Sequence, residues 1–367
     1  MSKKNNIAIV GATGLVGKTM LKIIEERNFP FNEIKLFASK KSVGTQIPFK
    51  NNFLTVEELY ENPFENIEIA LFSAGSFVSE KFAPIAKKSG CTVIDNSSFW
   101  RMKSEVPLVV PEVNSEKLQT HNGIIANPNC STIQLVVPLH FISQKYKIKH
   151  LNISTYQAIS GAGQEMLEQY YSEMKKTVSA CQNNSVIVSD SVAISFNLPE
   201  IATPLARNDS KICTTRNDAN KILNNIMFHS DFNENGNTVE EEKMINETRK
   251  ILDFPLLPIS VTCVRIPVEN SHCMSVNIEF EDFCNLEEIK NILSNSAGII
   301  FVDEKTSNKC NSPTPLLCNG RDEVFVGRLR KEIGSENIIS MWICADNLRK
   351  GAATNAVQIA ENLLKNV

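Results

Sequence analysis

A cysteine stands where a predicted strand ends and a predicted helix begins, at Cys130. The apolar run 123–126 predicts a short buried strand, and the Asn-Pro pair after it ends the strand, because a residue before proline avoids the helical region. Residues 131–139 are apolar behind good start signals and predict a helix. Unpaired N–H groups and the positive end of a helix dipole favour thiolate over thiol. We therefore predict that Cys130 is a nucleophile.

The alternative for Cys130 is a buried thiol that serves only as a small hydrophobic side chain. Its neighbours argue against an apolar pocket, because most of them are polar: Asn127, Asn129, Ser131 and Thr132. The sequence therefore favours the nucleophile, and the next question is which elements would bring reaction partners to it.

The first element is a glycine turn between an apolar strand at 7–10 and a helix at 18–27. Glycines let the backbone approach a pyrophosphate, which sits on the N-terminus of the following helix. The spacing is G-x-x-G-x-x-G, and the alternative is a tight turn without a ligand. The residues of this turn that we predict to bind a dinucleotide are Gly11, Thr13, Gly14, Leu15 and Val16.

The end of the second strand, at 34–39, indicates which dinucleotide binds. NAD-binding folds usually place an acidic residue there for the ribose hydroxyl, whereas this chain has Ser39, Lys41 and Ser42. Lysines and serines suit a 2′-phosphate, so NADP is predicted, with a solvated basic turn as the alternative. A third strand at 67–72 ends in Ser73, whose small side chain leaves room for the cofactor.

Composition excludes several classes of function. The net charge of −3 carries no basic block for nucleic acid, and the five histidines show no metal-ligand spacing. The ten cysteines form no C-x-x-C pair, the start does not read as a signal peptide, and no apolar run approaches the ~20 residues of a membrane helix. We expect a cytoplasmic protein with free thiols and no metal.

The 367 residues suggest two domains. We predict an α/β fold with a Rossmann-like dinucleotide-binding domain over 1–130, joined by a C-terminal helix at 347–367 that returns to it. Residues 131–346 are predicted to form an α+β catalytic and dimerisation domain with a mixed antiparallel sheet. Helices are expected at 164–177 and 239–251, whereas 178–236 gives no clear pattern.

Eight segments, spread in order from the first strand to the last helix, resemble the bacterial aspartate-semialdehyde dehydrogenases. These segments are GATGLVG at 11–17, SSFWRM at 97–102, VPLVVPEVN at 106–114, NPNCST at 127–132, YQAISGAG at 156–163, EEEKMINETRKI at 240–251, VRIPVENSH at 264–272 and NLRKGAATNAVQIAE at 347–361. That family reduces L-aspartyl 4-phosphate to L-aspartate 4-semialdehyde with NADPH, releases phosphate, and feeds the synthesis of lysine, methionine and threonine. The resemblance implies the same activity, and a homodimer, for this chain.

The resemblance also implies roles for individual residues. Cys130 would carry the acyl group as a thioester, His272 would exchange a proton at a pKa near neutrality, and Gln157 would orient the substrate carbonyl. The remaining residues would bind the substrate or the nicotinamide. Arg265 would bind the α-carboxylate, Glu240 the ammonium, and Lys243, Arg101 and Asn129 the phosphate, whereas Ser160, Gly161 and Asn347 would contact the nicotinamide.

Some of these residues could instead have ordinary structural roles. His272 could be a surface turn histidine, and Glu240 with Lys243 an ordinary surface ion pair. A hairpin is expected to present Arg265 and His272, seven residues apart, to one cleft. Two other functions also stay open, an N-acetyl-γ-glutamyl-phosphate reductase and a catalytically silent NADP-binding regulator. The substrate of that reductase carries no charged amine, so a Glu240 that binds an ammonium group would argue against the reductase.

Overall fold

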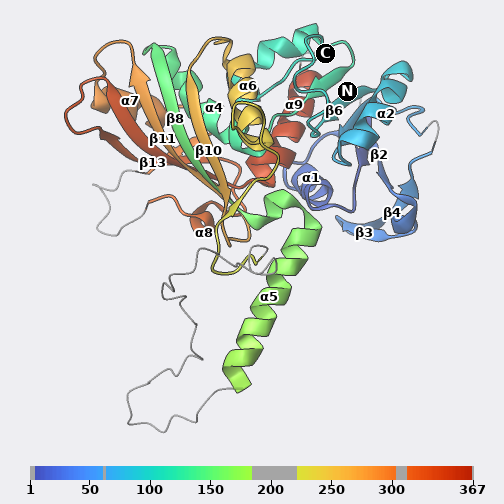
Figure 1. The fold of residues 1–367 in the computed structure, drawn as a ribbon. Coiled ribbons are helices and arrows are strands. Elements are labelled where there is room, and N and C mark those ends of the chain that lie inside the picture. The colour runs from blue at the N-terminus through green and yellow to red at the C-terminus, as the bar shows by residue number, and fades with distance from the viewer. Residues whose placement is uncertain (1–4, 61–62, 184–220, 303–311, 366–367) are drawn as a thin grey trace.

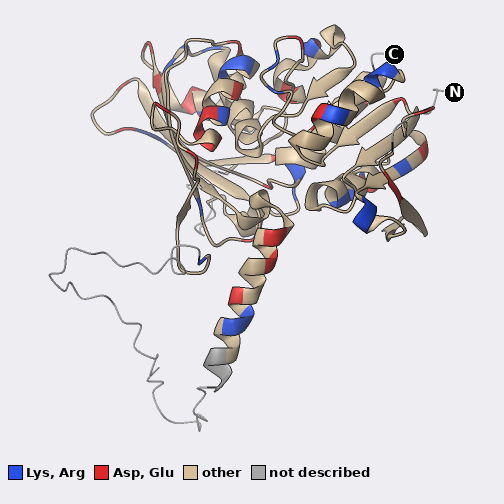
Figure 2. Cartoon of the chain, turned by 45° about the vertical axis from the view of Figure 1, so that its right-hand side comes forward, with Lys and Arg blue, Asp and Glu red and all other residues tan. Residues whose placement is uncertain are grey.

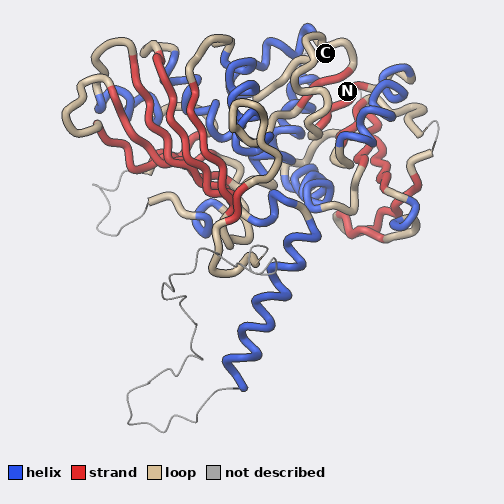
Figure 3. Tube along the Cα trace, viewed as in Figure 1, coloured by secondary structure: helices blue, strands red, loops and turns tan. Residues whose placement is uncertain are grey.

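The computed structural model describes residues 5–60, 63–183, 221–302 and 312–365, which form two seven-stranded sheets at opposite ends of the molecule (Figure 1). Helices fill the space between the two sheets, and one long helix, α5, extends away from the body (Figure 3). No helix within the described residues combines the length and apolar composition that a membrane crossing requires.

The first sheet has the strand order β3-β4-β2-β1-β5-β6-β7, and its pairs are parallel except for β3 with β4. The strands are β1 Asn5–Val10, β2 Phe31–Ala38, β3 Gln46–Phe49, β4 Asn52–Glu58, β5 Ile69–Phe72, β6 Thr92–Asp95 and β7 Ile124–Ala126. Their apolar residues point alternately to the two faces of the sheet: Ile7 and Ile9 pack into one core, Ala8 and Val10 into another. This is the predicted Rossmann-like sheet.

Helices cover both faces of this sheet. On one face lie α1, Leu15–Glu26, and α9, Thr354–Lys365, because each carries an apolar stripe at helical spacing. On the other face lies α2, Ser76–Lys88, with the short α3, Pro111–Asn114, farther along the chain. The C-terminal segment thus packs on the first sheet. The predicted boundaries of the two domains remain a prediction.

Helix α4, Cys130–Ser143, runs between the two sheets. Ten of its 14 residues are buried, and its apolar side chains point in every direction around the axis. A helix that is apolar all round must be enclosed by other elements. One core therefore continues from the second face of the first sheet, across α4, to the second sheet, and it fixes the start of α4 in the interior.

The second sheet is mixed, in the order β12-β13-β14-β11-β8-β10-β9. Its strands are β8 Ile148–Gln157, β9 Met227–Phe228, β10 Ile259–Arg265, β11 His272–Phe280, β12 Ile299–Phe301, β13 Val324–Lys331 and β14 Ile338–Ala345. The predicted hairpin of β10 and β11 is wrong, because β8 lies between them, parallel to β10 and antiparallel to β11. Arg265 and His272 still come together, since both flank the carboxyl end of β8.

The helices of the second half are α5 Gln164–Asn183, α6 Val239–Leu252, α7 Leu286–Ser294 and α8 Pro315–Cys318. Helix α5 is longer than the predicted 164–177 and carries charges of both signs along its length (Figure 2). Of the patternless region 178–236, residues 184–220 lie outside the described part of the chain. Helix α6 begins with a capping box: Thr238 accepts from the Glu241 backbone and Glu241 accepts from that of Thr238.

The C-terminal helix predicted at 347–367 is not one continuous α-helix. Residues Arg349–Ala353 form a π-helical turn before α9, with i→i−5 bonds from Gly351 N to Asp346 O and from Ala353 N to Leu348 O, both 3.0 Å. Such bulges are frequent at functional sites. Here the turn places Gly351 against Cys130, at the start of α4.

Candidate active site

Cys130 is the first residue of α4 and follows the short strand β7 after a three-residue connection, as the sequence predicts. Asn129 caps the helix, and its Oδ1 accepts the backbone N–H groups of Ser131 at 2.9 Å and Thr132 at 3.3 Å. A Cβ at Gly351 would stand 2.9 Å from the Cβ of Cys130, so only glycine allows this close approach. The cap and the glycine together fix the position of the sulfur.

The surroundings of Cys130 oppose the expected thiolate. Burial raises the pKa of the Cys130 thiol to about 11, and the Glu240 carboxylate raises it further, against the opposing charges of Arg101 and Arg265. The helix N-terminus favours an anion, but loss of hydration and a nearby like charge outweigh it here. At neutral pH the free protein therefore holds Cys130 as a thiol.

Gln157, the last residue of β8, connects the nucleophile helix to Arg265. Its Nε2 donates to Ser131 Oγ at 3.2 Å, and its Oε1 accepts from Arg265 Nη2 at 3.5 Å. Arg265 also donates to the carbonyl of Ala158. All three predicted site residues Cys130, Gln157 and Arg265 thus lie around one strand end.

His272 is fully buried, which excludes the surface-turn alternative. Its Nδ1 accepts the backbone N–H of Ala158 at 2.9 Å, so the neutral ring carries its proton on Nε2, which has no partner among the described residues. A Cβ at Gly161 would stand 2.9 Å from this Nε2 and 3.1 Å from Arg265 Nη1, so both groups face one small space.

The expected neutral-range pKa of His272 is wrong for the free protein. Burial lowers the pKa of the imidazole to about 3, and the Arg265 charge lowers it further. A buried imidazolium next to a guanidinium is unfavourable on both counts. His272 is therefore a neutral hydrogen-bond donor in the free protein.

Glu240 and Lys243 lie one turn apart at the start of α6 and pair at 3.2 Å. Glu240 also accepts from Asn129 Nδ2 at 2.8 Å, which joins α6 to the cap of the nucleophile helix. Burial opposes its charge, yet Lys243 and Asn129 stabilise the carboxylate and the pKa of Glu240 falls to about 2. Glu240 is thus a buried, ionised carboxylate of the site, whereas the Lys243 side chain is 31% exposed.

The glycine turn has the geometry of a nucleotide cradle. Gly11 has a φ of 88°, and a Cβ there would stand 2.3 Å from the carbonyl oxygen of Ser73; a Cβ at Gly17 would stand 2.2 Å from that of Gly11. Helix α1 begins at Leu15, and its N-cap Gly14 offers no side chain to the first N–H groups. These donors are available to an anion at the helix start.

The other predicted cofactor residues surround this turn. Ser42 Oγ lies 3.4 Å from Thr13 Oγ1, at the end of a 3-10 turn in which Lys41 is exposed and Ser39 is the N-cap. The backbone N–H of Ser73 donates to Val10 at 2.7 Å, which places it beside the turn.

The two predicted nicotinamide residues that carry polar side chains contact each other. Asn347 Nδ2 donates to Ser160 Oγ at 3.0 Å, and Asn347 Oδ1 accepts the backbone N–H of Ser271 at 2.8 Å. Leu15 of the glycine turn packs against the cluster that contains Ile159. The nucleotide turn, the Ser160 segment and the residue before His272 therefore adjoin.

The chain matches two family descriptions and a set of full-length relatives. Residues 6–121 match the semialdehyde dehydrogenase NAD-binding domain, and residues 139–350 match the semialdehyde dehydrogenase dimerisation domain. The aspartate-semialdehyde dehydrogenase of Aquifex aeolicus is 47% identical over 98% of both chains. This chain belongs to the aspartate-semialdehyde dehydrogenase family. It is an oxidoreductase of the aspartate pathway of amino-acid biosynthesis.

Further relatives agree over the whole length. The aspartate-semialdehyde dehydrogenase of Bacillus subtilis is 43% identical, covering 100% of this chain and 99% of its own. The crystal structure of aspartate-semialdehyde dehydrogenase II from Vibrio cholerae, complexed with ASA, has a TM-score of 0.84 at 37% identity and covers 100% of this chain and 99% of that one.

Two residues of this aspartate-semialdehyde dehydrogenase site were missed from the sequence. Glu247 is buried and binds Arg101 Nη1 at 3.0 Å and the Asn129 backbone N–H at 2.6 Å. A signal for it existed, since Glu247 lies seven residues after Glu240 and therefore on the same face of α6.

The second missed residue is His229, which follows the short strand β9. Pairing of Met227 with Arg265 places it beside β10, and its Nε2 is buried without a partner among the described residues. Burial lowers the pKa of His229, whereas the Glu240 carboxylate raises it. A lone histidine in a region without periodicity gave no signal in the sequence.

Proposed function

We propose that the protein reduces L-aspartyl 4-phosphate to L-aspartate 4-semialdehyde with NADPH through a thioester on Cys130. The observation that carries this proposal is the meeting of Cys130, Gln157, Arg265 and His272 around the end of β8. An acetylated substrate has no charged amine for a carboxylate to bind, so the alternative reductase does not explain Glu240. Glu240 is ionised and accepts a hydrogen bond from Gln157 in the same site.

The proposed first step forms the thioester. The Cys130 sulfur attacks the acyl carbon and gives up its proton, the carbon–oxygen bond to phosphate breaks, and inorganic phosphate leaves with the electron pair and the thiol proton. Arg265 would hold the α-carboxylate and Glu240 the ammonium, while Arg101, Asn129 and Lys243 would hold the phosphate. Three N–H groups of Arg101 bind protein acceptors, which leaves two of its five for a phosphate.

The residues around the glycine turn fit NADP. Only glycine fits at positions 11 and 17, and the start of α1 has no side-chain cap, so this turn suits a pyrophosphate. The polar side chains of Ser39, Lys41 and Ser42 suit a 2′-phosphate. Bound NADPH supplies the hydride that reduces the thioester.

His272 would stabilise the reduced intermediate. Its Nε2–H would donate a hydrogen bond to the oxygen that becomes charged as the thioester is reduced. When the carbon–sulfur bond breaks, the Cys130 sulfur leaves with the electron pair and the aldehyde departs. The Arg265 charge lowers the pKa of His272. A substrate carboxylate on Arg265 would offset that charge, so substrate binding would bring the pKa of His272 back toward its ordinary value.

We also propose a homodimer in the cytoplasm. The match to a dimerisation domain over residues 139–350 supports the dimer. The seven cysteines whose side chains the structure describes are all free thiols, which is the state that a reducing compartment maintains.

The test is the Cys130→Ala variant assayed in the oxidative direction with L-aspartate 4-semialdehyde, phosphate and NADP. We expect kcat to fall at least about a thousandfold, since loss of a nucleophile removes the whole covalent route. Binding of NADP, measured by calorimetry, should stay within twofold of wild type. Turnover within tenfold of wild type would refute the thioester route, and a wild type that binds NADP without turnover would support a silent regulator. Reaction of the wild type only with the acetylated glutamate semialdehyde would favour the alternative reductase.

A further inference from the structure

One face of α6 carries four charged residues at spacings of three, four and three: Glu240, Lys243, Glu247 and Lys250. The first two are proposed to bind substrate. The other two continue the same face toward the loop that carries Arg101, and the proposed mechanism gives them no role. Glu247 is only 1% exposed, so it is not a solvated surface charge.

Glu247 connects the guanidinium of Arg101 to the nucleophile helix. One carboxylate oxygen accepts from Arg101 Nη1 at 3.0 Å, and the other accepts the backbone N–H of Asn129 at 2.6 Å. Asn129 is the residue that caps the helix of Cys130. A single buried carboxylate therefore sets the position of Arg101 relative to the sulfur.

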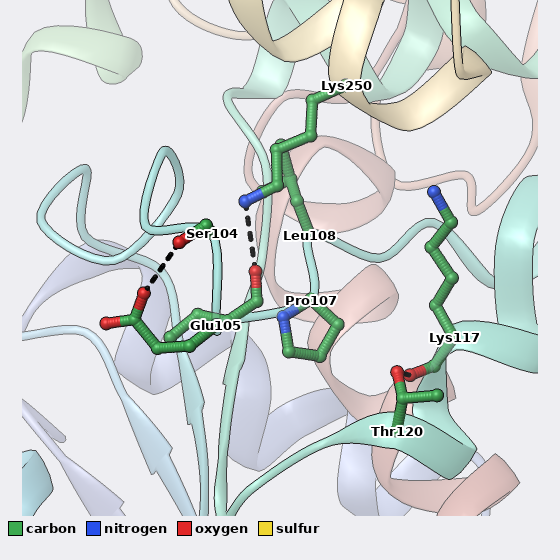
Figure 4. Close-up of a pocket in the computed structure, with 8 residues that line it drawn as sticks. Ser104, Glu105, Pro107, Leu108, Lys117, Thr120 and Lys250 are labelled. Carbon is green, nitrogen blue, oxygen red and sulfur yellow. Dashed lines mark hydrogen bonds between the residues drawn. The ribbon is translucent and has the colours of Figure 1, made fainter.

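Lys250 holds the backbone of the same loop. Its Nζ donates to the carbonyl oxygens of Arg101 at 2.7 Å, Lys103 at 2.8 Å and Val106 at 3.0 Å, so all three of its N–H groups are used. Figure 4 shows Lys250 against the loop, beside a hollow of about 330 Å³. Folding the loop around one ammonium fixes where the Arg101 side chain begins.

The remaining contacts of Arg101 complete the arrangement. Its Nε and Nη2 donate to the carbonyl oxygens of Asn127 at 3.0 Å and Asn96 at 2.7 Å. The side chain is thus held along its whole length, with Lys250 at the backbone and Glu247 at the guanidinium. One N–H group remains on each of the two terminal nitrogens, and an arginine donates such a pair to an oxyanion in bidentate fashion.

We propose that Glu247 and Lys250 are positioning residues that hold Arg101 for the phosphate of the reaction. This inference rests on the proposed role of Arg101 in phosphate binding. Glu247 and Lys250 touch no substrate themselves. They act through Arg101, and their removal should weaken the phosphate half of the site selectively.

The test compares Glu247→Gln and Lys250→Met with wild type in the oxidative direction, where phosphate is a substrate. We expect each to raise the KM for phosphate about tenfold, because each removes hydrogen bonds to a charged group. The KM values for NADP and for the semialdehyde should stay within twofold. Lys250→Arg, which keeps a charged donor, should raise the KM for phosphate less than Lys250→Met.

The matched control is Glu242→Gln, the same chemical change on the same helix. Glu242 accepts hydrogen bonds from Asn233 and Asn237, away from Arg101. The Glu242→Gln variant should therefore have the wild-type KM for phosphate. A general loss of kcat with all KM values moving alike, or an unchanged KM for phosphate in both variants, would overturn the inference.

A fourth variant separates this inference from the proposed function. Arg101→Lys should raise the KM for phosphate at least as much as Glu247→Gln. If Arg101→Lys does so and the two positioning variants do not, the inference fails and the phosphate role of Arg101 stands. If Arg101→Lys leaves the KM for phosphate unchanged, the proposed role of Arg101 fails and the inference fails with it.

Discussion

At the scale of single residues, the site holds its two reactive groups in uncharged form. The pKa of Cys130 is raised to about 11 and that of His272 is lowered to about 3, in both cases first by burial. A thiolate–imidazolium pair is therefore absent from the free protein at neutral pH. The sequence could name both residues, but it could not show the surroundings that the fold gives them: His272 is fully buried and Cys130 is half-buried beside Glu240.

This view predicts the pH dependence of Cys130 alkylation in the free protein. A thiol with a pKa of about 11 is ionised to about one part in a thousand at pH 8, so the rate with iodoacetamide should rise about tenfold per pH unit from pH 7 to pH 10. Mass spectrometry of the Cys130 peptide measures the rate separately from the other cysteines.

The Glu240→Gln variant sharpens this prediction. Glu240 raises the pKa of Cys130, so its removal should speed alkylation several-fold at pH 8, whereas Glu242→Gln should not. A rate that levels off by about pH 9 would show that the thiol ionises in the ordinary range or below it. The environment of Cys130 would then differ from that described.

At the scale of elements, the strands and helices with strong periodicity were predictable, and their long-range neighbours were not. The alternating apolar residues of β1 and the stripe of α1 follow directly from local pattern. The hairpin of β10 and β11 was wrong because β8, more than a hundred residues upstream, supplies better pairing for both strands. Local spacing carries no information about such an insertion.

The π-helical turn is a second element that local pattern could not predict. Residues 346–364 have helical periodicity throughout, yet the fold requires Gly351 to meet Cys130 and Lys350 to reach a buried carboxylate. An ordinary helix would place these two residues differently, so the turn is widened by one residue at this point.

This arrangement predicts the effect of Gly351→Ala. The new Cβ would stand 2.9 Å from the Cβ and 3.3 Å from the Cα of Cys130, so α4 or the turn must shift. Overpacking of this kind destabilises by about 1–3 kcal/mol, and displacement of the sulfur should lower kcat about tenfold or more. Steady-state kinetics and thermal unfolding measure the two effects. Wild-type kcat together with wild-type stability would show that the contact is not tight.

At the scale of the whole molecule, the motifs were sufficient to predict two sheets and the residues that meet between them. Arg101, Glu240 and Arg265 come from three distant segments, and the sequence predicted their chemistry from resemblance and residue type. The residues that hold them were harder to find, because Glu247 and Lys250 look like any charged helix face until the loop that they bind is in place. Their partners lie more than a hundred residues away.

Another long-range connection joins the C-terminal segment to the first half of the chain. Lys350 is fully buried and donates to Glu112 Oε2 at 2.7 Å, across 238 residues of sequence, and also to Asn355 and Gln358. Burial opposes ionisation of Glu112, but Lys350 overcomes it and lowers the pKa of this carboxyl. The ion pair thus anchors the π-helical turn beside Cys130.

A double-mutant cycle on this pair tests how the two halves are held. Glu112→Leu alone leaves a buried ammonium without its carboxylate and should lower the free energy of unfolding by about 3–5 kcal/mol. Adding Lys350→Met removes the unpaired charge, so the double variant should be more stable than Glu112→Leu. Chemical denaturation of the three variants and the wild type measures the coupling. If the free energy of unfolding lost by the double variant equals the sum of the losses of the two single variants, the charges do not interact. The anchor would then depend on Asn355 and Gln358 instead.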